Sequence, residues 1–227
     1  MRDRSPPVAR AGRLPAAASL DLVCCSAVDR QLVVLTHPTG RGATATLPWM
    51  VLDPTTALDA AASRFARSQL GRQAAWITQL GGSGEGRRHP SGAALSVSYV
   101  AVVPIGTAAP EGMRWDALTA LPTFPARQAA MVTAAITALR DRMDLEPIAF
   151  RMLTAEFTLS ELQDVYELLL GRRLHKASFR RALQGAYLVE PTDTWRSEGR
   201  GRPAQIFRYA PRKRRSLRRS VRFELLG

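Results

Sequence analysis

Cysteine and histidine are scarce in this chain, which argues against several kinds of site. The 227 residues contain two cysteines, Cys24 and Cys25, and three histidines. Neighbouring Cα atoms lie ~3.8 Å apart, short of the usual disulfide span, and a strand would send the two thiols to opposite faces. We therefore predict two small apolar residues in a reducing cytoplasm. His37, His89 and His175 show no metal-ligand spacing, so we predict no metal site.

Long apolar runs are absent as well. No run approaches the ~20 residues that span a bilayer, so we predict no membrane partner. The first 19 residues contain no apolar block of the signal-peptide type, and we predict a disordered leader over residues 1–17. Hydrophobic residues make up 46% of the chain and charged residues 22%, which is typical of a globular protein with buried cores.

Acidic residues are too few to balance the basic ones. The formal net charge is +13. Residues 150–227 hold 17 Lys and Arg against 8 Asp and Glu, whereas residues 1–149 hold 15 against 11. A basic composition throughout the chain would not concentrate the surplus in its last third. We therefore predict a polyanionic partner for the C-terminal part.

The N-terminal two thirds of the chain alternate between strand and helix patterns. We expect strands over residues 20–27, 31–36, 43–52, 74–80 and 95–104, and helices over residues 57–70 and 128–143. The first two strands form a hairpin, residues 81–92 form a Gly-rich loop, and Trp115 lies in a connecting loop. Strands on both sides of a helix predict an α/β layer structure.

A helix with clear start and stop signals begins the C-terminal part. Thr158 and Glu161 fit a capping box, and Phe157 with Leu162 fits the hydrophobic staple. Apolar residues then recur at helical spacing up to Gly171, which ends the helix.

A second, basic helix follows after a short turn. It should start near Lys176 and bury Phe179 and Leu183, while Lys176, Arg180 and Arg181 point outward. Two short strands joined by a loop rich in Gly and Arg complete the pattern. Such a helix suits the major groove of DNA. Taken alone, the pattern fits equally a helical hairpin with a solvated charged face.

Several motifs resemble one known family. The segments LPWMVLDPTTALDAAASRFARSQLG, ITQLGG, RRHPSG and VSYVAVVP resemble a Nudix domain. The segments FTLSELQDVYELLLG, KASFRRAL and GRGRPAQIFRY are similar to the winged helix of the Nudix-related transcriptional regulators, the NrtR family. The resemblance implies a Nudix-like α/β/α sandwich with a mixed sheet plus a C-terminal winged helix-turn-helix domain. It also implies a homodimeric repressor of NAD-metabolism genes that senses ADP-ribose or an NAD-related nucleotide. The implied domains are residues 18–144 and 145–211, with a basic tail over 212–227.

The resemblance also provides a test for catalysis. Active Nudix hydrolases carry the box G-x5-E-x7-R-E-U-x-E-E-x-G-U, where U is a bulky apolar residue. Its positions fall on Met50, Thr56, Arg64, Phe65, Ser68, Gln69 and Gly71. Mg²⁺ needs oxygen ligands, but Thr56, Phe65, Ser68 and Gln69 stand where the box has Glu. We therefore predict no catalytic residues, no required cofactor and no enzyme activity.

Loss of catalysis leaves room for ligand binding. Arg64, Gln79, Arg87 and Arg88 are the effector-binding candidates, since guanidinium groups grip phosphates. The alternatives are a structural salt bridge for Arg64 and a solvated loop for Arg87 and Arg88. His89 and the pair Ala126-Arg127 depart from the family pattern, which has an acid before the Pro of the loop and an Asp-His pair before the helix.

The resemblance assigns the DNA-binding parts too. The candidates in the second helix are Lys176, Ser178, Arg180 and Arg181, and those in the wing are Arg200 and Arg202. A double-stranded operator read by a homodimer is the implied partner. Two other functions compete: a nucleoside-diphosphate-type Nudix hydrolase, similar to ADP-ribose pyrophosphatase, with an atypical metal site, and an RNA-binding or scaffold protein that uses the basic tail.

Overall fold

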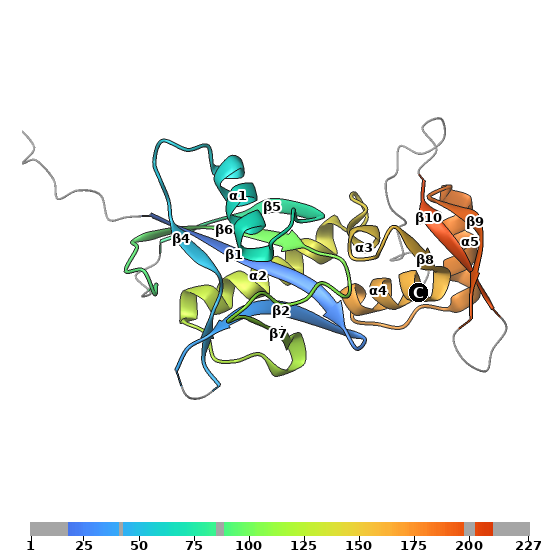
Figure 1. Cartoon of the computed structure of the whole chain (residues 1–227), viewed down its shortest axis with the longest axis horizontal. Helices are drawn as coiled ribbons and strands as arrows, with labels where there is room; N and C mark the ends of the chain where they lie inside the picture. Colours follow the sequence, from blue (N-terminus) through green and yellow to red (C-terminus); the bar gives the residue numbers. More distant parts are fainter. Residues whose placement is uncertain (1–17, 41–42, 85–88, 198–202, 211–227) are drawn as a thin grey trace, which may run out of the picture.

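The protein is seen here as a computed structural model that describes residues 18–40, 43–84, 89–197 and 203–210. A larger N-terminal part and a smaller C-terminal part lie side by side along the long axis of the molecule (Figure 1). The predicted leader over 1–17 and the predicted basic tail over 212–227 lie outside the described residues.

A seven-stranded mixed sheet forms the middle layer of the N-terminal part. Its strands are β1 (Ala18–Val28), β2 (Gln31–Pro38), β3 (Ala45–Thr46), β4 (Trp49–Val51), β5 (Trp76–Ser83), β6 (Leu95–Val102) and β7 (Arg114–Ala117). The main path runs β3-β2-β1-β6-β5, with β4 paired to β1 and β7 to β2. Strands β1 and β6 are parallel, while β5 pairs antiparallel with β6 and forms an edge.

The predicted hairpin at the start of the chain is confirmed. Asp29 and Arg30 both have positive φ, 47° and 59°, as two-residue turns that match the twist of a β-hairpin require. The connecting loop predicted at Trp115 is wrong: this residue belongs to the four-residue strand β7, which pairs with β2.

Two helices cover the two faces of this sheet (Figure 1). Helix α1 (Leu58–Leu70) packs over one face, and α2 (Ala126–Arg142) over the other. Cys24 lies in the core under α1 and Cys25 in the core under α2, both fully buried. The expected α/β/α sandwich is therefore present, and the cysteines act as small apolar core residues on opposite faces.

A three-stranded sheet and three helices make up the C-terminal part. The elements are α3 (Ile148–Arg151), β8 (Glu156–Thr158), α4 (Leu159–Leu170), α5 (Lys176–Ala186), β9 (Val189–Arg196) and β10 (Ala204–Tyr209). In the N-terminal part, a 3₁₀ turn, η1 (Leu118–Ala120), precedes α2. The sheet order is β8-β10-β9. Two helices joined by a short turn and followed by a β-hairpin give the winged helix arrangement.

Helix α4 begins and ends as its sequence predicts. The Thr158 hydroxyl accepts from the Glu161 amide at 3.1 Å, and the Glu161 carboxylate accepts from the Thr158 amide at 2.6 Å. Gly171 closes the helix in the left-handed conformation, with φ 68°. The reciprocal bonds satisfy two backbone donors that the first turn of a helix leaves unpaired.

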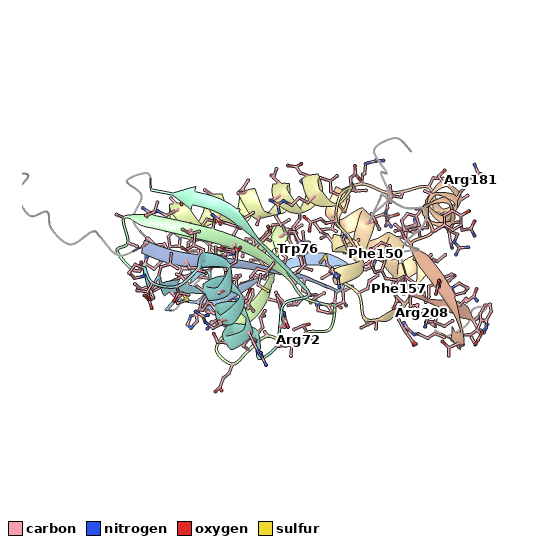
Figure 2. All side chains as sticks on the ribbon, turned by 90° about the horizontal axis from the view of Figure 1, so that it is seen from above. Arg72, Trp76, Phe150, Phe157, Arg181 and Arg208 are labelled. Carbon is pink, nitrogen blue, oxygen red and sulfur yellow. The ribbon has the colours of Figure 1, made fainter. Side chains whose placement is uncertain are left out.

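One continuous apolar core joins the two parts. Residues of α2 pack in the same cluster as Phe150 of α3, Phe157 of β8 and the buried face of α4. The guanidinium of Arg140 in α2 donates from Nε to the Leu169 carbonyl of α4 at 2.8 Å. The indole of Trp76 in β5 donates to Glu146, just before α3, and Figure 2 shows Trp76 at this junction. Among the described residues no helix has the length and hydropathy of a membrane span.

Candidate functional site

The outward face of α5 carries three cations. Lys176, Arg180 and Arg181 are exposed, and none of them forms an ion pair with a residue that the structure describes. Phe179 and Leu183, on the inward face, are 1% and 0% exposed. Figure 2 shows Arg181 at the end of the molecule farthest from the N-terminal domain. The helix thus has one packed side and one cationic side, as the spacing predicts.

Ser178 differs from the other candidates on this helix. Its side chain is half-buried, and its hydroxyl lies 3.3 Å from His175 Nδ1, at the residue before the helix. This contact is local and helps to close the first turn of α5. Ser178 lies three positions before Arg181 on α5, on the same side of the helix, and its role in DNA binding stays a prediction.

A buried carboxylate holds the turn that leads into α5. Glu167 accepts hydrogen bonds from the Leu174 amide at 3.0 Å, from Gln163 Nε2 at 2.8 Å and from the Arg173 guanidinium at 2.8 Å. Burial raises the pKa of Glu167, but these three hydrogen bonds outweigh it and hold the pKa below its ordinary value. The charged carboxylate thus fixes the position of α5 relative to α4. No local pattern in the sequence indicates this role.

The hairpin of β9 and β10 is positioned as a wing beside these helices. Arg196 of β9 forms an ion pair with Glu161 at 2.7 Å, which ties the strand to the first turn of α4. Trp195, on the same strand, is 57% exposed. The predicted wing contacts Arg200 and Arg202 lie outside the described residues.

The box positions of the N-terminal domain lie on and just before α1. Thr56 precedes the helix, Phe65 packs against the core under α1, and the Ser68 hydroxyl donates to the Phe65 carbonyl at 2.8 Å. Gln69 is half-buried. Within the part of the chain that the structure describes, no group of three or more His, Cys, Asp or Glu could hold a metal ion.

Two of the four effector candidates lie on the α1 side of the sheet. Arg64 is exposed on α1, and its charge contributes to a lowered pKa of Asp53, after the hydrogen bonds from Thr55 that are the main cause. Gln79 of β5 is exposed, and Tyr99 OH lies 3.5 Å from its side-chain oxygen. Arg64 forms no salt bridge within the described residues.

The other two effector candidates, Arg87 and Arg88, lie outside the described residues. His89, which follows them, is buried. Its Nε2 lies 2.8 Å from Asp21 Oδ1, and Gln128 Nε2 donates to the same oxygen at 2.7 Å. The Gln128 side-chain oxygen in turn accepts from the Leu47 amide. This network joins β1, α2 and the end of the Gly-rich loop, so His89 has a structural role here.

Arg127 lies beside this network at the start of α2. It is only 4% exposed, and it donates from Nη1 to the Ala93 carbonyl at 2.9 Å and to Ser96 Oγ at 3.1 Å. In the sequence, the pair Ala126-Arg127 differs from the pattern of the family that this chain resembles. The burial of the Arg127 guanidinium could not be predicted from this difference, because the residues that surround the guanidinium are 31 to 34 positions away along the chain.

Comparisons with known proteins agree with this architecture. Residues 149–209 match the family model described as the NrtR DNA-binding winged helix domain. A repressor of Acinetobacter baylyi, named the ADPR responsive transcriptional repressor NtrR, is 28% identical over 162 residues. That match covers 67% of this chain and 64% of the Acinetobacter protein, so it spans just under two thirds of that relative's length.

Solved structures extend the likeness over both parts of the chain. NrtR of Shewanella oneidensis in complex with a 27-mer DNA matches with a TM-score of 0.72 and 26% identity, covering 86% of this chain and 94% of that one. A MutT/nudix family protein from Enterococcus faecalis matches with a TM-score of 0.64 and 18% identity, covering 87% and 89%. The second likeness supports the fold alone.

Proposed function

We propose that this chain, a member of the NrtR family of Nudix-related regulators, is a DNA-binding transcriptional repressor whose N-terminal domain senses a nucleotide. The observation that carries the proposal is the cationic outward face of α5, in a domain that matches the NrtR winged helix. The Shewanella NrtR with this architecture was solved bound to DNA. A repressor of this kind would work in the cytoplasm, where it meets the chromosome.

The proposed DNA interface combines α5 with the wing. Lys176, Arg180 and Arg181 would face the major groove, where Arg side chains read guanine edges bidentately. Arg200 and Arg202 in the wing would contact the backbone or the minor groove. One 11-residue helix reads only a few base pairs, so we propose a homodimer on a roughly palindromic site.

The proposed effector is ADP-ribose or a related nucleotide, and the regulated genes are those of NAD metabolism. The name of the Acinetobacter relative, which describes it as ADPR responsive, supports this. Arg64 and Gln79 would bind the effector on the α1 side, with Arg87 and Arg88 from the adjacent loop. Titration with ADP-ribose checks the site: Arg64→Ala should weaken binding, whereas Arg142→Ala, on the opposite helix, should not.

We also propose that the N-terminal domain does not hydrolyse nucleotides. Thr56, Phe65, Ser68 and Gln69 offer no carboxylate where Nudix chemistry needs metal ligands. The alternative is an ADP-ribose pyrophosphatase-like hydrolase with an atypical metal site. Incubation with Mg²⁺ and ADP-ribose distinguishes the two, because turnover above that of a heat-denatured sample would favour the hydrolase.

The DNA-binding proposal is tested by matched charge removals. Arg180→Ala and Arg181→Ala should each weaken binding to DNA from upstream of the protein's own operon by ~5- to 150-fold, the range of a lost base contact. Arg72→Ala removes the same charge from an exposed position in the N-terminal domain. If the Arg72 variant loses as much affinity as the other two, binding reflects overall charge and the proposed interface is wrong.

A further inference from the structure

A half-open cavity of about 240 Å³ lies between α2 and the edge strand β5. Because α2 covers the sheet face opposite to α1 (Figure 1), this cavity is separate from the side that carries Arg64 and Gln79. Its volume falls just below the ~300–1,000 Å³ of pockets that enclose drug-sized ligands. It therefore suits a compound with a single ring.

Small residues on both walls create this space. Gly81 and Gly82 of β5 leave one wall without side chains, and Ala130 with Ala134 forms the facing wall on α2. The two alanines are four positions apart, so they lie one above the other on the same face of the helix. A Cβ built on Gly81 meets no atom within 4 Å. The walls are thus mainly apolar, and the space between them exists because the glycines and alanines have little or no side chain.

The cation that lines this cavity has no counterion among the residues that the structure describes. Arg127 donates to the carbonyls of Ala93 and Ala94 and to the hydroxyl of Ser96, all of them neutral acceptors. No carboxylate of a described residue lies within ion-pair distance of its guanidinium. Asp21 is connected to it only through a chain of hydroxyls, Ser96 and then Ser19. A buried charge without a counterion is costly for a fold.

The unused donors of Arg127 lie on one edge of the guanidinium. The group has five N–H donors. Nη1 uses both of its hydrogens, and Nη2 uses one in a long contact of 3.4 Å to the Ala94 carbonyl. Nε is buried without a partner, so Nε–H and one hydrogen of the neighbouring Nη2 remain. The Ser83 hydroxyl, which also lines the cavity, is buried without a partner as well.

We propose that this cavity binds a small planar carboxylate. Two adjacent N–H groups match the two oxygens of a carboxylate in a bidentate pair, and the Ser83 hydroxyl can donate a third hydrogen bond. Because Arg127 Nε and Ser83 Oγ are covered in the ligand-free protein, binding requires a small shift of these side chains toward the cavity. The apolar walls would take up the ring. Adenine does not offer this pattern, because its N7 acceptor lies beside the N6 amine, which is a donor. The cavity also lies on the sheet face opposite to Arg64 and Gln79, so the site is distinct from the one proposed for the nucleotide effector.

The test uses benzoate as the probe and the full-length protein, with no DNA or nucleotide present, so its outcome does not depend on the repressor function. Isothermal titration should show saturable binding to the wild type. Arg127→Met should weaken it at least about tenfold, the equivalent of one lost charge-assisted hydrogen bond. Ala134→Leu should abolish it by filling the cavity. Ala129→Leu places the same side chain on an exposed position of α2 outside the cavity and should leave binding unchanged.

Several results would overturn the proposal. Absence of benzoate binding to the wild type would do so, as would retained affinity in Ala134→Leu. Binding of inorganic phosphate with the same affinity as benzoate would show that the planar apolar body is not recognised. Arg127→Met removes donors from buried carbonyls and could lower stability, so the Ala134 variant, which keeps every hydrogen bond of Arg127, provides an independent result.

Discussion

The carboxylate of Glu167 offers a sharp test of how α5, the proposed DNA-binding helix, is held in place. It accepts three hydrogen bonds, from the Leu174 amide, from Gln163 and from Arg173. Leu174 is buried at the end of the turn before α5. Truncation in Glu167→Ala therefore leaves a buried backbone donor without a partner.

The size of the effect follows from the exposure of each partner. An unpaired buried amide costs about 1–3 kcal/mol. The Arg173 side chain is 81% exposed, so its ion pair contributes at most about 1 kcal/mol. We expect Glu167→Ala to lower the free energy of unfolding by about 2–4 kcal/mol. Arg173→Ala removes only the exposed partner, and we expect a loss of at most about 1 kcal/mol.

Urea unfolding at neutral pH, followed by far-ultraviolet circular dichroism, compares the two variants with the wild type. Because Glu167 fixes the turn before α5, we also expect Glu167→Ala to bind DNA more weakly under conditions where it stays folded. If Glu167→Ala and Arg173→Ala have equal stabilities, the buried amide does not depend on the carboxylate and the reasoning fails.

Three further predictions use the same logic. The lowered pKa of Glu167 means that its stabilisation is present above the unfolded value, about 4.3, and is lost as the pH falls through the folded value. The stability difference between the wild type and Glu167→Gln should therefore shrink on acidification below about pH 4, and a constant difference would contradict this. Thr158→Ala removes one half of the capping box and should cost about 1 kcal/mol in urea unfolding; an unchanged midpoint would show that water replaces the bond. Burial raises the pKa of Cys25 to about 12, and burial together with the Cys25 charge raises that of Cys24. Neither thiol should react with a disulfide reagent at neutral pH until urea unfolds the protein, and rapid reaction of the native protein would show that they are accessible.

Local signals in the sequence predicted much of the C-terminal domain correctly. The capping box needs only Thr158 and Glu161, three positions apart, and the two faces of α5 follow from the spacing of Phe179 and Leu183. Gly171 ends α4 because a left-handed residue favours glycine. Such patterns depend on neighbours within one or two turns, and for this reason they can be recognised without a structure.

Helix α1 shows where local patterns mislead. The helical spacing of Leu58, Ala61, Ala62 and Phe65 predicts one apolar stripe that faces the core, yet Leu58 is 37% exposed and Phe65 is only half-buried. The buried residues are Ala61, Ala62, Ala66 and Leu70. Small side chains let a helix approach a sheet closely, so alanine can be buried more completely than a neighbouring larger residue. A spacing argument based on residue size does not detect this.

The polar contacts of the N-terminal domain could not be predicted because they join distant segments. Asp21 accepts from Gln128, which is 107 positions away, and contacts His89, which is 68 positions away. The burial of Arg127 likewise depends on how α2 lies over β6. Sequence analysis identified His89 and Arg127 as departures from a family pattern, but only the three-dimensional arrangement shows that one completes a network and the other lines a cavity.

Binding of the wild-type protein to DNA from upstream of its own operon, measured with and without ADP-ribose, tests the central claim most directly. The account predicts a specific dissociation constant in the range of ~10⁻⁸–10⁻¹¹ M that rises steeply with salt and that changes when ADP-ribose is added. Equal affinity for the operator and for a random duplex, or an affinity that ADP-ribose leaves unchanged, would contradict a nucleotide-sensing repressor.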